Sequence, residues 1–98
     1  MNEYVTQFKA LGDPLRLRIL NLLPVEEKCE DMYNVSELSE ELGVSQPTVS
    51  HHLKILKDAG LVTCKRMCRD VYYWINRDVL KAAGRALADG TFCRPPRA

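Results

Sequence analysis

The sequence predicts a mainly α-helical domain that carries one small β-hairpin, with its elements in the order ααααββα. Three observations support this prediction. Apolar residues recur at helical spacing through most of the first 60 residues. Two of the helical stretches, 34–43 and 45–60, are joined by a tight turn that contains Gly43. After Gly60 the pattern changes from helical to alternating, as expected for strands.

The length of the chain limits it to one domain, because 98 residues are too few for a second core. We expect the domain at residues 1–92 and a flexible C-terminal tail at 93–98. A domain this small is only marginally stable alone, which favours association with a second copy. No apolar run approaches the roughly 20 residues that cross a membrane, and the N-terminus lacks a signal-peptide core. We therefore expect a cytoplasmic protein with no membrane partner.

The first third of the chain predicts two helices. Residues 3–11 place Phe8 and Leu11 on one side. In the second helix Asp13 can serve as N-cap and Pro14 as the first helical residue, where its missing N–H has no cost. This helix is apolar over most of its circumference, so we expect it to be buried, partly against a second subunit.

Residues 34–43 and 45–60 predict a helix-turn-helix. We expect Ser36 to cap the first of these helices and Gly43 to end it. Ser45 can open the second helix, which ends at Gly60.

The alternating stretches 61–66 and 69–75 predict a hairpin with its turn at Met67-Cys68. A last helix is expected from Asp78, as its cap, to Gly90. Helix, helix, helix-turn-helix, hairpin and helix is the order of a winged helix-turn-helix.

The formal net charge of +1 hides a separation of charge along the chain. Residues 25–42 contain seven acidic residues and one lysine, whereas residues 43–69 contain five basic residues and one aspartate. Positive charge concentrated on one part of a surface suits a polyanion such as double-stranded DNA.

The helix at 46–58 places its apolar residues on one stripe. Val49, Leu53 and Leu56 share this stripe, which we expect to be buried. The outward surface then carries hydroxyl, imidazole and ammonium groups at Ser50, His51 and Lys54, which suit base edges and phosphates in the major groove of DNA. The cations expected to grip backbone phosphates are Lys54, Lys57, Lys65, Arg66 and Arg69.

The adjacent histidines His51 and His52 do not have the pattern of a metal site or a catalytic pair. His51 points away from the buried stripe, whereas His52 lies about 60° from Val49 and is expected to be a half-buried packing residue. A zinc pair on a helix prefers positions i and i+4 with a third ligand nearby. No nucleophile, base and orienting group are spaced for catalysis, so we do not expect an enzyme.

The stretches "FKALGDPLRLRILNLL", "VSELSEELGVSQPTVSHHLKILKDAGLV" and "RDVYYWI" resemble the ArsR/SmtB family of winged-helix repressors. The resemblance implies a homodimer, built from the first and last helices, that binds an inverted-repeat operator. It implies release from DNA by an effector, often a thiophilic or borderline metal ion. It also implies that the hairpin is a wing against the neighbouring DNA, and that the bases are approached by Ser45, Gln46, Thr48, Ser50 and His51.

Two metal sites common in the family are absent as usually written. Asn34 and Ser36 occupy the positions of a Cys-x-Cys pair, and the last helix contains no histidine. Four cysteines remain, and a chain without an export signal should keep them as thiols. We hypothesise that no cofactor is required and that a thiolate-bound metal or metalloid, or thiol oxidation, is the effector. The candidate ligands are Cys64, Cys68 and Cys29, with Cys93 as a further thiol.

Three other interpretations stay open at this point. The cysteines can be small apolar fillers of the core. The chain can be a winged-helix protein-interaction module without DNA binding, for which Ile55 is the one apolar candidate on the recognition helix. A small thiol enzyme or metal carrier requires a CxxC motif or a Cys-His pair in a pocket, and the sequence shows neither.

Overall fold

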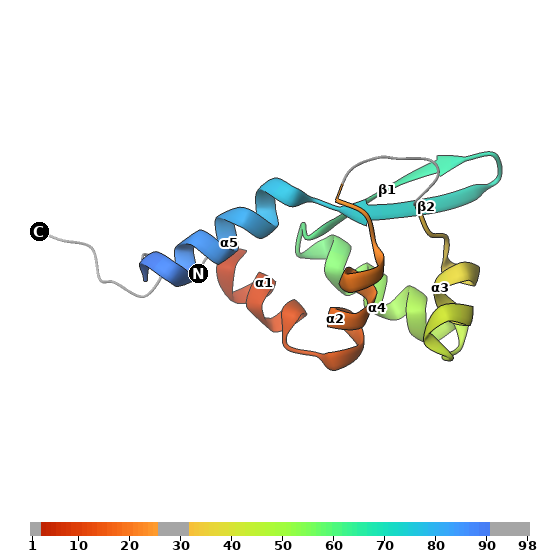
Figure 1. Cartoon of the computed structure of the whole chain (residues 1–98), viewed down its shortest axis with the longest axis horizontal. Coiled ribbons are helices and arrows are strands. Elements are labelled where there is room, and N and C mark those ends of the chain that lie inside the picture. The colour runs from red at the N-terminus through yellow and green to blue at the C-terminus, as the bar shows by residue number, and fades with distance from the viewer. Residues whose placement is uncertain (1–2, 26–31, 91–98) are drawn as a thin grey trace, which may run out of the picture.

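The computed structural model describes residues 3–25 and 32–90, and the order of elements in this part is ααααββα, as predicted (Figure 1). The elements are α1 (Glu3–Leu11), α2 (Pro14–Leu22), α3 (Val35–Leu42), α4 (Gln46–Asp58), β1 (Val62–Met67), β2 (Asp70–Ile75) and α5 (Arg77–Asp89). The predicted tail at 93–98 lies outside the described residues. No helix within the described ranges is long and apolar enough to span a membrane.

Asp13 caps α2 as predicted, with Pro14 in the first turn. The Asp13 Oδ1 accepts hydrogen bonds from the backbone N–H groups of Leu15 at 2.9 Å and Arg16 at 3.2 Å. Burial raises the pKa of the Asp13 carboxyl, but these hydrogen bonds, together with the nearby Arg16 guanidinium, leave it below its ordinary value. The charged carboxylate is therefore the form that begins the helix.

Two predicted caps are wrong. Asn34, and not Ser36, caps α3: its Oδ1 accepts from the backbone N–H of Glu37 at 2.8 Å, and Glu37 Oε1 accepts from the N–H of Asn34 at 3.0 Å. This reciprocal pair satisfies two free N–H groups at once, which Ser36 cannot do. Likewise Asn76 caps α5, and Asp78 lies in the first turn, where its charge favours the positive end of the helix.

The turn of the hairpin lies at Cys68-Arg69, one residue later than predicted. Both residues have positive φ, 55° and 97°, as in the two-residue turns that match the twist of paired strands. In this register Val62 pairs with Ile75, and both side chains are buried. Burial of this pair in the core explains why the strands choose this register over the neighbouring one.

The core lies where the helices and the base of the hairpin meet. The largest fully buried side chains are Ile19, Leu38, Val49, Leu53, Leu56 and Leu61. Helix α2 buries Ile19 and Leu20 but leaves Leu17 51% exposed. Helix α2 is thus only partly buried within a single chain, and burial of its exposed residues against a second subunit stays a prediction.

The hairpin is attached to the connection between α2 and α3. The backbone N–H of Ile75 donates to Pro24 O at 2.8 Å, and that of Tyr73 donates to Tyr33 O at 3.1 Å. Asn34 Nδ2 also donates to Asp70 Oδ2 at 3.3 Å. Backbone contacts therefore hold the hairpin beside α3. In Figure 1 the hairpin turn lies at the α3 end of the molecule, and α1 and α5 lie at the other end.

Candidate nucleic-acid interface

The turn between α3 and α4 sets the angle of the two helices. Gly43 adopts φ 69°, a left-handed conformation that glycine takes without strain. Its backbone N–H donates to Ser39 O at 2.9 Å, and the Ser39 hydroxyl donates to Val44 O. Hydrogen bonds with Ser39 thus hold both residues of the turn, Gly43 and Val44, as expected for a helix-turn-helix.

Helix α4 begins at Ser45, as predicted. The Ser45 Oγ accepts from the backbone N–H of Thr48 at 3.4 Å and lies 2.8 Å from the Thr48 hydroxyl. Ser45 and Gln46 are exposed, and Thr48 is half-buried. The N-terminal end of α4 therefore presents an amide and a pair of bonded hydroxyls to solvent.

The buried and outward sides of α4 are those that the apolar stripe predicted. Val49, Leu53 and Leu56 are at most 1% exposed. On the other side of the helix Ser50, His51, Lys54 and Lys57 are exposed. The structure thus brings together on one surface the polar groups of α4 that suit base edges and phosphates.

Lys54 forms an ion pair with Asp58, one turn along α4, at 3.1 Å. The two side chains are 75% and 63% exposed. Exposed pairs at this spacing contribute only about 0.3–0.5 kcal/mol, so Lys54 can exchange Asp58 for a DNA phosphate at little cost.

The cations of the hairpin do not share one face. Lys65 and Arg66 are consecutive on β1, opposite Tyr72 and Val71, so their side chains leave opposite faces of the sheet. Arg69 lies in the turn itself, exposed, at a φ of 97° that non-glycine residues rarely adopt. This φ is the one that the second residue of such a two-residue turn requires, and it places Arg69 at the tip of the hairpin.

The cysteines are not assembled into a metal site in the described part of the chain. Cys64 is a half-buried free thiol in β1, paired across the hairpin with Tyr73, and Cys68 is an exposed free thiol in the turn. Burial, with the nearby Cys64, raises the pKa of Tyr73, against the effect of Lys57. No three His, Cys, Asp or Glu residues among those described lie close enough to hold a metal ion. Cys29 and Cys93 lie outside the described residues.

His51 is exposed and His52 half-buried, as predicted. Their rings meet edge to face, with centroids 5.3 Å apart and an angle of 64° between the planes. One partner of His52 was not predicted from the sequence: its Nδ1 lies 3.1 Å from Nη1 of Arg16 on α2. A signal was present, because Arg16 precedes the buried Ile19 by three residues and so shares its face of the helix.

Ile55 is half-buried and packs against the core. It is therefore not an exposed apolar residue of α4, and the feature that favoured a protein-interaction module is absent at this position.

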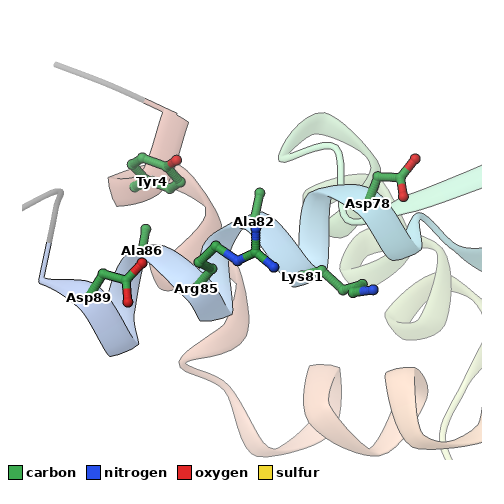
Figure 2. A pocket seen from close by; sticks show the side chains of 7 residues that line it. All are labelled: Tyr4, Asp78, Lys81, Ala82, Arg85, Ala86 and Asp89. Carbon is green, nitrogen blue, oxygen red and sulfur yellow. The ribbon is translucent and has the colours of Figure 1, made fainter.

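A hollow of the described surface lies away from α4, between α1 and α5. It has a volume of about 490 Å³, and Figure 2 shows Tyr4 of α1 beside the α5 residues that line it. Those α5 residues are Asp78, Lys81, Ala82, Arg85, Ala86 and Asp89. This shallow, charged groove carries no nucleophile or metal ligand set that would indicate catalysis.

The fold and the polar outer side of α4 define a winged helix-turn-helix regulator of the DNA-binding class. The family model described as "Bacterial regulatory protein, arsR family" matches residues 13–63, just over half of the chain. The chain belongs to this family, and it is a transcriptional regulator and not an enzyme.

Proteins with known roles are similar over most of this chain. The transcriptional repressor SdpR of Bacillus subtilis is 40% identical over 74 residues, which are 76% of this chain and 77% of that protein. The arsenical resistance operon repressor of Staphylococcus xylosus is 41% identical over 78 residues, 80% of this chain and 70% of that one.

Solved structures show the same fold. An ArsR-like transcriptional regulator from Rhodococcus sp. RHA1 superposes with a TM-score of 0.76 at 29% identity, over 89% of this chain and 77% of that one. A homodimeric winged helix-turn-helix DNA-binding domain from Mycobacterium bovis superposes with a TM-score of 0.70 at 27% identity, over 98% of this chain and 87% of that domain.

Proposed function

We propose that the chain is a transcriptional repressor that binds an inverted-repeat operator as a homodimer, with α4 in the major groove and the hairpin as a wing beside it. The observation that carries this proposal is the division of α4 into a buried side and a polar outer side. Val49, Leu53 and Leu56 anchor the helix, so the exposed Ser50 and His51 are held at the surface. The relatives named as repressors support the direction of regulation.

The groups of the interface divide by chemistry. Side chains with paired donors and acceptors near the start of α4 suit base edges, and these are Ser45, Gln46, Thr48, Ser50 and His51. Long cationic side chains suit phosphates, which set position without sequence preference, and these are Lys54, Lys57, Lys65, Arg66 and Arg69. The N-terminus of α4 adds its own attraction for phosphate. Chromosomal DNA as partner implies a cytoplasmic location.

The proposed dimer uses α1 and α5. Val5 on α1 is 39% exposed and Leu87 on α5 is 60% exposed, and the groove beside Tyr4 gives a second copy a surface to fill (Figure 2). Apolar side chains left in water at one end of a small domain are stabilised by a symmetric partner. The homodimeric Mycobacterium bovis domain supports this assembly. Two copies then present two α4 helices to half-sites about 10 base pairs apart.

Selection from a pool of randomised DNA duplexes tests the proposal. We expect the wild-type chain to enrich an inverted repeat, and to bind the enriched duplex at least about 10³-fold more tightly than a scrambled duplex of equal composition. Absence of any enriched sequence would instead favour a winged-helix module that binds protein.

Variants of the two groups of residues are expected to distinguish base contacts from phosphate contacts. Ser50→Ala or His51→Ala should reduce the preference for the enriched duplex by about 1–3 kcal/mol while leaving binding to scrambled DNA nearly unchanged. Lys54→Ala or Arg66→Ala should weaken binding to both duplexes equally. Gel-shift titrations on the two duplexes measure both quantities. An equal loss on both duplexes for His51→Ala would remove His51 from the base-reading set.

The proposed effector acts on the thiols of the wing. Cys64 and Cys68 are free thiols in the element placed beside DNA, and the relative from Staphylococcus xylosus is a repressor of an arsenical resistance operon. Soft metal ions and metalloids bind thiolates, and Cys29 from the segment outside the described residues can complete the ligands. In this proposal the repressor binds DNA when no effector is present, and it needs no cofactor to do so.

Titration of the reduced dimer with arsenite, cadmium and zinc, followed by gel shift, tests this effector. We expect the double variant Cys64→Ser, Cys68→Ser to stay on DNA at effector concentrations that release the wild type. The single variant Cys93→Ser is the matched control and should release normally. Normal release of the double variant would dismiss Cys64 and Cys68 as ligands.

A further inference from the structure

Arg16 connects three helices through one guanidinium group. From α2, its Nε donates to Ala10 O at 2.6 Å and its Nη2 to Lys9 O at 3.4 Å, at the C-terminal end of α1. Its Nη1 lies 3.1 Å from Nδ1 of His52 on α4. Arginine has donors only, so Nδ1 must be the acceptor. The contact is therefore a hydrogen bond that Arg16 donates and the His52 ring accepts.

The ring of His52 also contacts the ring of His51. The two rings meet edge to face at a centroid distance of 5.3 Å, an arrangement favoured for neighbouring aromatic rings. His52 is half-buried and in contact with Arg16, whereas His51 is exposed. If the ring of His52 is held in place, the neighbouring ring of His51 can adopt fewer rotamers. His51 then loses less conformational entropy when it forms a hydrogen bond.

We propose that Arg16 and His52 are positioning residues for base recognition, which hold the imidazole of His51 in the orientation that reads DNA. The inference rests on the proposed function, in which His51 approaches a base. Neither Arg16 nor His52 needs to touch DNA for this effect. The contact between Arg16 and His52 joins residues 36 positions apart in the sequence, so it belongs to the tertiary structure and not to α4 alone.

A mutant cycle between Arg16 and His51 tests the proposal. Arg16→Lys keeps the positive charge and a donor group but loses the planar fork that reaches two carbonyls and an imidazole. We expect it to lower the ratio of affinities for the enriched and scrambled duplexes by roughly fivefold, a part of what one base contact provides. In the His51→Ala background the same change should leave the ratio unaltered, because the side chain being positioned is gone.

Two further variants keep the test decisive. His52→Phe retains a ring but no acceptor for Arg16, so it should reproduce the loss and its dependence on His51. Arg18→Lys alters an exposed cation of the same helix and should change nothing. Thermal unfolding of each variant shows whether the fold is kept, and His52→Phe replaces Arg16→Lys as the test if the latter unfolds.

A loss of the same size with and without His51 would assign Arg16 a general structural role and overturn the proposal, as would no loss at all. A wild-type chain without preference for any duplex would be a different failure, because it would remove the proposed function itself.

Discussion

Leu53→Ala is expected to lower the free energy of unfolding by about 3 kcal/mol, within the range of roughly 2–5 kcal/mol for a buried leucine. Leu53 is 1% exposed and belongs to the core that joins α4 to the other helices. Truncation removes apolar contacts and leaves a cavity that a close-packed interior fills only in part. Since a domain of this size has a total stability of about 5–15 kcal/mol, α4 would be held much less firmly against the core.

Urea unfolding at a fixed protein concentration measures this effect, because the stability of the proposed dimer would depend on concentration. The midpoint should move to lower urea with little change of slope. Lys57→Ala, an exposed change on the same helix, is the matched control and should stay within about 0.5 kcal/mol of the wild type. Equal stability of Leu53→Ala and the control would show that the apolar side of α4 is not the anchor described above.

The affinity for DNA is expected to fall steeply with salt. Five cations of the interface are exposed in each protomer, at positions 54, 57, 65, 66 and 69. If three of them per protomer reach phosphates, the dimer makes six contacts and the log–log slope of affinity against salt is about −5, since each contact adds about −0.9. Between 50 and 200 mM salt the affinity would then drop by about 10³-fold.

Equilibrium binding at four or five salt concentrations gives this slope. Arg66→Ala should reduce its magnitude by about 2, one contact from each protomer. Arg18→Ala removes an exposed cation of α2, outside the proposed interface, and should leave the slope unchanged. A slope near zero for the wild type is incompatible with an interface built on phosphate contacts.

Periodicity predicted the helices and the buried side of α4, because burial at helical spacing is a local property of the sequence. Val49, Leu53 and Leu56 could face only one way once the helix was recognised. The cap of α3 was assigned wrongly although its signal was present. Asn34 is followed three residues later by Glu37, as a capping box requires, whereas Ser36 is followed by Ser39.

Features that depend on distant parts of the chain could not be predicted in this way. The hairpin register follows from burial of Val62 opposite Ile75 in the core, and the sequence around the turn contains no glycine to mark it. The contact of Arg16 with His52 joins two helices. Strand alternation alone places Lys65 and Arg66 on opposite faces of the hairpin. Which residues of β2 they lie opposite depends on the register, which could not be predicted.

Methylation interference on the enriched duplex tests most directly whether the outer side of α4 enters the major groove. Methyl groups at guanine N7 occupy the major groove, and those at adenine N3 occupy the minor groove. We predict that N7 methylation blocks binding in two half-sites about 10 base pairs apart, and that N3 methylation acts only at the flanks, beside the wing. Interference confined to the minor groove, with N7 methylation harmless in both half-sites, would contradict the central claim.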